Sequence, residues 1–206
     1  MRRIYFILLG VVVLGGAVYV YLHRQDWGLA GSSSGSSGSD QASHPAQVSW
    51  TMVDRSPEGF KVEMPAETRE IEVPAYNQQG GAEQVPMIYS YPDPATSYSI
   101  SWADNPPVAR SVSEDPKQTL DTARNGALAR TQTQLVSEAQ STRQGFPVRD
   151  FVGRNQSGGV FNARLVLADH RLYLLMAAFQ TAGSRRDDDV NRFFDSFRVV
   201  SAAQGQ

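Results

Sequence analysis

The chain contains no cysteine, and only two of its 19 basic residues, Lys61 and Lys117, are lysine. The absence of thiols excludes disulfides, thiol catalysis, thiolate metal sites and lipid attachment through cysteine. The formal net charge is −2 and no long basic run is present, so nothing in the charge favours binding to nucleic acid. The composition therefore points away from disulfide-bonded proteins, thiol enzymes, thiolate metal sites and nucleic-acid-binding proteins.

Histidine is almost as scarce, with His23, His44 and His170 in three distant parts of the chain. They are not expected to converge, so neither a zinc site nor a catalytic triad is predicted. No glycine-rich loop follows a strand and opens a helix, which leaves nucleotide binding unsupported. The acidic run 187–189 fits the start of a helix better than a calcium site, because its carboxylates point in different directions. We expect no metal, no cofactor and no enzymatic activity.

The sequence does contain one long apolar run, at its start. Nineteen uncharged residues extend from Ile4 to Leu22. As a helix they would span about 28 Å, close to the roughly 30 Å of a bilayer's hydrocarbon core. Residues 1–24 are therefore predicted to form an uncleaved transmembrane anchor that inserts into the bilayer through residues 4–22. A cleaved signal peptide is the alternative, although its apolar stretch would be shorter.

Basic residues near the two ends of this segment predict its orientation. Arg2 and Arg3 precede the apolar run together with the α-amine, whereas only Arg24, close to Asp26, follows it. Because basic residues favour the cytoplasmic side, we expect a single-pass protein with a cytoplasmic N-terminus. Everything after the anchor would then lie outside the inner membrane, in the periplasm or beyond.

Residues 25–47 are predicted to form a disordered tether. Glycine, serine and other polar residues dominate the segment, and no apolar period is present to offset the entropy cost of ordering it. The pentapeptide at 31–35, GSSSG, matches the G-x-S-x-G pattern of serine hydrolases by letter only. That chemistry requires a turn between a strand and a helix, and His and Asp partners, which this segment lacks. A short disordered tail is expected at 201–206.

Residues 48–200 are predicted to form one α+β domain, an antiparallel sheet of about six to eight strands covered by helices. Alternating or continuous apolar patterns predict strands at 48–54, 60–64, 69–76, 83–91, 96–104, 134–142, 146–155, 160–169 and 172–181. The last of these is nearly all apolar, so we expect it at the centre of the sheet. Pro74 and Pro86 lack a backbone N–H, which predicts edge or bulged strands around them.

Two helices are predicted from caps and from 3.6-residue periodicity. The first lies within 113–132, with Asp115 as N-cap and Pro116 at the first helical position. Its apolar stripe consists of Leu120, Ala123, Ala127 and Leu128. The second lies within 184–197, with Ser184 as N-cap and Asp187 completing an approximate capping box. Its apolar stripe, Val190, Phe193, Phe194 and Phe197, is expected to pack on the sheet.

The pattern of the domain resembles a known family. It contains Gly145-Phe146-Pro147-Val148-Arg149-Asp150-Phe151, then Arg164 in the next strand and Leu172-Tyr173 in the one after. This order resembles the PsbP-like fold, named for an extrinsic subunit of photosystem II, and is similar to the DcrB-like bacterial envelope lipoproteins. The resemblance covers roughly residues 50–200. It implies an antiparallel sheet with helices on its faces, an extracytoplasmic docking module of a bacterial envelope and no catalytic residue.

The most informative polar residues are Arg149, Asp150 and Arg164, which interrupt otherwise apolar strands. Alternation places Arg149 on the sheet face opposite Asp150. A structural interpretation has each arginine covering apolar surface with its stem and pairing its head with a carboxylate or carbonyl. A functional interpretation has them bind an anion or a partner. Tyr89, Tyr91, Tyr98 and Trp102 are a second candidate set. Alternation places Tyr89 and Tyr91 on one face, and the rings are predicted either to cover the core or sheet or to form an aromatic docking surface.

These features favour a binding or scaffolding module that is anchored in the membrane and docks an envelope protein partner. A carrier domain for a small ligand, held between sheet and helices, is the alternative.

Overall fold

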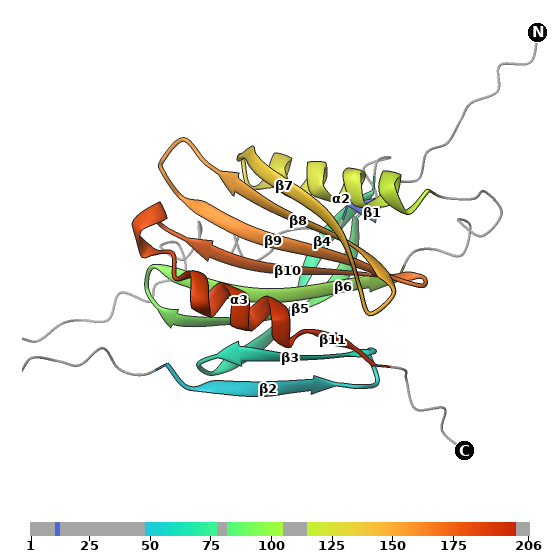
Figure 1. Cartoon of the computed structure of the whole chain (residues 1–206), viewed down its shortest axis with the longest axis horizontal. Coiled ribbons are helices and arrows are strands. Elements are labelled where there is room, and N and C mark those ends of the chain that lie inside the picture. Colours follow the sequence, from blue (N-terminus) through green and yellow to red (C-terminus); the bar gives the residue numbers. More distant parts are fainter. Residues whose placement is uncertain (1–10, 13–47, 78–81, 105–114, 201–206) are drawn as a thin grey trace, which may run out of the picture.

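A computed structural model of the protein describes residues 11–12, 48–77, 82–104 and 115–200 (Figure 1). The tether, the tail and nearly all of the predicted anchor lie outside the described residues. Within the anchor, Val11–Val12 form a two-residue strand, β1, rather than part of a helix. No other residue of the predicted span is described, so the anchor remains a prediction. Across the described ranges, no helix has both the length and the apolar character needed to cross a membrane.

The described residues form two antiparallel sheets and two helices, which confirms the predicted α+β architecture. The strands are β1 (Val11–Val12), β2 (Trp50–Arg55), β3 (Phe60–Pro65), β4 (Thr68–Asn77), β5 (Ala82–Asp93), β6 (Thr96–Asp104), β7 (Gln134–Arg143), β8 (Phe146–Arg154), β9 (Val160–Ala168), β10 (Arg171–Phe179) and β11 (Arg198–Val199). The helices are α2 (Pro116–Arg130) and α3 (Asp187–Ser196).

The larger sheet has eight strands in the order β1-β4-β5-β6-β10-β9-β8-β7. Its centre is β10, which pairs along its whole length with β6 on one side and β9 on the other. All of β10 after Arg171 is buried, as its continuous apolar sequence predicts. The smaller sheet, in the order β11-β3-β2, joins the two ends of the domain and was not predicted.

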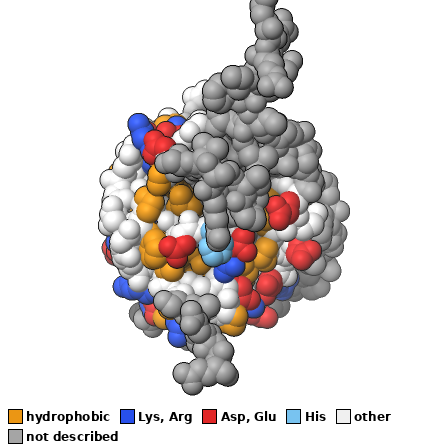
Figure 2. Space-filling model, turned by 90° about the vertical axis from the view of Figure 1, so that its right-hand side faces the viewer, with side chains coloured by type: hydrophobic (Ala, Val, Ile, Leu, Met, Phe, Trp, Pro, Cys, Tyr) orange, Lys and Arg blue, Asp and Glu red, His pale blue; other side chains and the backbone are white. Residues whose placement is uncertain are grey.

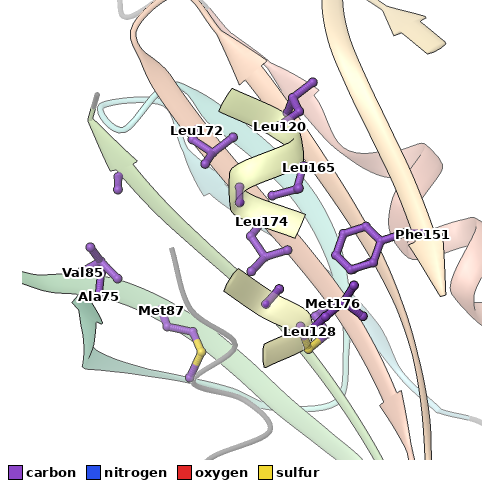
Figure 3. Close-up of a cluster of buried hydrophobic side chains, with 14 of the residues drawn as sticks. Ala75, Val85, Met87, Leu120, Leu128, Phe151, Leu165, Leu172, Leu174 and Met176 are labelled. Carbon is purple, nitrogen blue, oxygen red and sulfur yellow. The ribbon is translucent and has the colours of Figure 1, made fainter. Parts of the chain in front are cut away.

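Helix α2 covers one face of the large sheet, over β8 and β9 (Figure 1). The Asp115 side chain accepts a hydrogen bond from the Lys117 amide at 3.0 Å, so the predicted N-cap is confirmed. The predicted stripe of Leu120, Ala123, Ala127 and Leu128 is buried in the same core cluster as residues from the sheet. Figure 3 shows Leu120 and Leu128 close to Leu165, Leu174 and Met176 of that cluster.

Helix α3 and the small sheet cover the opposite face, where the second core cluster lies. Val190, Phe193 and Phe194 of α3 are buried there, as predicted. The predicted cap is wrong: Ser184 ends a 3₁₀ turn, η3 (Ala182–Ser184), and α3 begins only after Arg186. Arg185 and Arg186 have extended backbones, so the helix starts too late for Ser184 to reach its amides. The acidic residues of the first turn provide favourable charge there instead.

The prediction from the two prolines is only partly right. Strand β4 is an edge strand for most of its length, because β1 pairs only with its last two residues, so Pro74 is tolerated there. Strand β5 lies between β4 and β6, and its irregularity falls between Ser90 and Asp93 rather than at Pro86. The remaining edge of the large sheet is β7, whose ten residues are all exposed.

Candidate functional site

A buried arginine on β9 connects the sheet to the end of α3. Antiparallel pairing places Arg164 directly opposite Asp150 of β8, on the face covered by α3. The guanidinium is only 5% exposed and donates two hydrogen bonds to that carboxylate, from Nε at 2.7 Å and from Nη2 at 3.1 Å. Its Nη1 donates to the Phe194 carbonyl at 2.9 Å, and its Cζ lies 5.0 Å from the Phe194 ring centroid. Arg164 therefore satisfies a carbonyl at the C-terminal end of α3.

The same arginine forms one wall of a cavity of about 420 Å³, which we call the arginine pocket. Three segments far apart in the sequence enclose it: the turn between β7 and β8, the middle of β9, and the connection from α3 to β11. Its lining residues are Arg143, Gln144, Arg164, Val166, Phe194, Asp195, Phe197 and Arg198. The lining combines apolar side chains with three guanidinium groups, a combination that suits an anionic group on an organic ligand.

Charge in the arginine pocket is unevenly balanced. Arg143 lies 3.1 Å from Asp195, and Arg164 is 3.5 Å from the same carboxylate. Arg198 donates through Nη1 to the Phe197 carbonyl at 2.8 Å and also to the Asp195 carbonyl. Three cationic side chains thus face two carboxylates, Asp195 and the Asp150 paired with Arg164, which leaves one net positive charge. The pocket is matched to a monovalent anion such as a carboxylate, which the planar fork of arginine binds well.

A tight turn places one polar side chain at the rim of this pocket. Gln144 and Gly145 connect β7 to β8 with φ of 52° and 84°, the left-handed conformations of a two-residue hairpin turn. The turn directs the Gln144 side chain toward β11, where its Oε1 accepts a hydrogen bond from the Val199 amide at 3.0 Å. No residue lining the pocket is a histidine, serine or threonine, and its one carboxylate, Asp195, is paired with Arg143 and Arg164.

Arg149 lies on the other face of the sheet, as the alternation predicts. It is 1% exposed and forms ion pairs with Asp121 of α2 and Glu138 of β7. Arg124 also pairs with both carboxylates. The hydrogen bond from Arg124, together with the weaker influence of Arg149, holds the pKa of Glu138 below its usual range. Arg149 and Arg164 therefore do not form one site, because the sheet separates them.

The aromatic residues singled out from the sequence are also divided between the two faces. Tyr89 and Tyr91 share the α2 face, with ring centroids 5.4 Å apart in an edge-to-face arrangement. Tyr89 is partly buried against the core cluster there. Tyr98 and Trp102 lie in the opposite cluster, where burial raises the pKa of Tyr98 well above its usual range. These four rings do not form a single docking surface.

A second cavity, of about 340 Å³, lies at the other end of β8 and β9. Its lining is uncharged: Thr131, Thr133, Asn155, Ser157, Gly159, Val160, Phe161, Ala178, Phe179, Gln180 and Thr181. Several of these polar groups are already engaged with neighbours, since the Thr131 and Thr133 hydroxyls are 2.6 Å apart and Asn155 Oδ1 accepts from the Gly159 amide. This neutral cavity has the size for a small ligand but offers it few free hydrogen-bonding groups.

His170 is exposed at the turn between β9 and β10, with its Nε2 3.9 Å from Asp104. Figure 2 shows the one described histidine on the surface among acidic and basic side chains. Arg171 donates to the same carboxylate and lowers the pKa of Asp104. Within 48–77, 82–104 and 115–200, no group of three or more histidine and acidic side chains is arranged to hold a metal ion.

The sequence pattern singles out Arg164 and its partner Asp150, but not the other polar residues of the arginine pocket. Arg143, Gln144, Asp195 and Arg198 stand at the ends of predicted elements, where polar residues are ordinary. The Gln144-Gly145 pair between two predicted strands is the one sequence feature here that indicates a local structure, and it indicates a turn rather than a binding site. The residues come together through sheet pairing and helix docking, which no local pattern encodes.

Comparisons with known proteins find similarity only at the level of structure. No protein-family model matches the chain, and no curated protein matches it in sequence. The structure is similar to cyanobacterial PsbP (CyanoP) from Synechocystis, with a TM-score of 0.49 and 14% identity, covering 79% of this chain and 98% of that one. It is also similar to a protein of unknown function from Pseudomonas aeruginosa, with a TM-score of 0.30 and 13% identity, covering 66% of this chain and 85% of that one. The first of these structures is a PsbP protein, the family that the sequence pattern resembles.

Proposed function

We propose that this chain is a non-enzymatic docking module whose arginine pocket receives a carboxylate presented by a protein partner of the cell envelope. The observation that carries the proposal is the convergence of Arg143, Arg164 and Arg198 on one cavity with a net positive charge. The apolar lining residues Val166, Phe194 and Phe197 beside these cations favour a carboxylate attached to a peptide over a free inorganic ion. The docking function rests on this pocket and not on Arg149, whose charge is neutralised inside the domain.

The proposed location follows from the sequence. The segment 4–22 would hold the protein in a bacterial inner membrane, and the tether at 25–47 would let the domain reach a partner outside the cytoplasm. A tether of this kind raises the local concentration of the pocket near membrane-bound partners without adding a contact.

The test uses the full-length chain in mild non-ionic detergent micelles. Binding of a glutamate-containing peptide is compared with binding of the same peptide with glutamine in its place. We expect the glutamate peptide to bind more tightly, and Arg143→Gln or Arg198→Gln to remove that preference. Arg154→Gln, which removes an exposed arginine at the far end of β8, is the matched control and should leave the preference intact. Equal binding of the two peptides by the unchanged protein would contradict the proposal.

A small-ligand carrier is the second candidate, and the neutral cavity beside Phe161 and Phe179 is the observation that favours it. Thermal melts with a library of uncharged metabolites distinguish the two functions. A carrier would be stabilised by one member of the library, by about 2.7 kcal/mol at a hundredfold excess over Kd. A docking module would melt at the same temperature with every member.

A further inference from the structure

The arginine pocket adjoins the free edge of a strand. Strand β11 pairs with β3 on one side only, with Arg198 opposite Lys61 and Val199 opposite Phe60. The Val200 amide donates to the Gly59 carbonyl at 2.9 Å, so it points toward β3. In an antiparallel strand successive amides alternate in direction, and the Val199 amide therefore points away from β3, toward the pocket. An extended peptide would find at this edge the backbone groups it needs to add another strand.

Two backbone groups along this edge form hydrogen bonds with side chains of the same protein. The Gln144 carboxamide oxygen accepts from the Val199 amide at 3.0 Å. The Arg198 guanidinium donates to the Phe197 carbonyl at 2.8 Å. A side-chain carboxamide has the same carbonyl as a peptide bond, and a guanidinium N–H replaces a peptide N–H. Together, Gln144 and Arg198 make two of the hydrogen bonds that a neighbouring strand would make.

We propose that the partner is an extended acidic peptide that adds to β11, displaces the Gln144 side chain and places its carboxylate in the arginine pocket. The inference rests on the proposed docking function and specifies its ligand. Gln144 is exposed on a hairpin turn, so its carboxamide can leave the Val199 amide and be solvated without opening the core. A peptide N–H that donates to the Phe197 carbonyl would replace one hydrogen bond of the Arg198 guanidinium, which can then pair with the incoming carboxylate. Figure 1 shows the turn between β7 and β8 reaching toward β11, with no strand between them.

The probe is an acetylated and amidated hexapeptide of alternating threonine and valine with one central glutamate. Its Kd is measured by fluorescence anisotropy with the full-length chain in detergent micelles. The variant Gln144→Asn keeps the turn, because asparagine accepts a positive φ, but its side chain is one methylene too short to reach the Val199 amide. We expect it to bind the peptide about fivefold more tightly, since one competing surface hydrogen bond is gone. Gln144→Gly, which also accepts this φ, should behave in the same way.

Two further measurements separate strand addition from simple charge attraction. A peptide carrying N-methyl groups on the bonds that would face β11 should bind at least tenfold more weakly than its parent. Hydrogen exchange at the Val199 amide should slow when the unmodified peptide binds. If both Gln144 variants and the N-methylated peptide show unchanged Kd values while the glutamate preference persists, the strand-addition inference is overturned and the docking function stands. If the glutamate peptide binds no better than its glutamine analogue, both fall.

Discussion

The two buried arginines should respond very differently to the same substitution. Replacing Arg164 by methionine keeps most of the side-chain volume but removes the two hydrogen bonds to Asp150 and the one to the Phe194 carbonyl. In the described structure Asp150 pairs with no other cation, although its side chain is 31% exposed and keeps partial access to water. Breaking a fully buried pair costs about 3–5 kcal/mol, and this partial hydration reduces the expected loss to about 2–3 kcal/mol.

Arg149→Met should cost only about 1 kcal/mol, although Arg149 is the more deeply buried of the two. Its partners Asp121 and Glu138 are each about one-third exposed, and both retain Arg124 as a cation after the substitution. In addition, Arg149 Nε has no hydrogen-bond partner in the described part of the chain, so removing the group also removes a desolvation cost.

Thermal melts and urea titrations of the full-length chain in detergent, followed by far-ultraviolet circular dichroism, measure both losses. For a chain of this size Arg164→Met should lower Tm by about 4–10 °C, and Arg149→Met by about half of that or less. Adding Asp150→Asn to the Arg164 variant should cost less than about 1 kcal/mol more, since its partner is already gone. A larger loss for Arg149→Met than for Arg164→Met would show that Arg149, and not Arg164, holds the more important ion pair.

Four further predictions test the fold, the electrostatics and the location. Phe193→Ala should lower the free energy of unfolding by about 3–5 kcal/mol because the ring is fully buried, whereas exposed Asp188→Ala should cost well under 1 kcal/mol in the same melts. The pKa of Glu138 lies below its unfolded value, so its ion pairs stabilise the fold above about pH 4.5 and are lost as the pH falls; Arg124→Gln should flatten that acid dependence of Tm. Halving the segment 31–40 should change the free energy of unfolding by less than about 1 kcal/mol, and a larger loss would show that the tether packs on the domain. A reporter that is active only outside the cytoplasm should be active when fused to the C-terminus. In cell fractions, the intact chain should remain with salt-washed membranes, and recovery of a soluble, shortened protein would contradict the anchor.

The parts of the fold that follow from local patterns were predictable. Phe60 and Val62 alternate with polar residues and are buried on one face of β3. The apolar stripe of α2 that begins at Leu120 is buried against the sheet, and the Asp115 cap forms as expected. Each of these depends on residues within about one helical turn or one strand, where spacing alone determines which side chains share a face.

What could not be predicted depends on contacts between distant segments. The small sheet exists because β11, near the end of the chain, pairs with β3, near the start of the domain. The predicted start of α3 is wrong because a serine followed by acidic residues is a valid cap pattern, and only the 3₁₀ turn and the extended backbone of Arg185 and Arg186 exclude it. The arginine pocket combines residues from a turn, a strand and a helix end. Which of them meet depends on the register of β8 against β9, which no local pattern specifies.

That register also explains why the structural and functional interpretations of Arg164 are compatible. Its Nε and Nη2 are held by Asp150, which fixes the plane of the guanidinium. Its Nη1 points to the Phe194 carbonyl and toward Asp195, at the wall of the pocket. One side chain therefore contributes a fixed cation to the site through the same ion pair that stabilises the fold, whereas exposed Arg143 can move toward a ligand at little cost in stability. Binding energy can thus be changed at Arg143 or Gln144 while the ion pair beneath them keeps the pocket in shape.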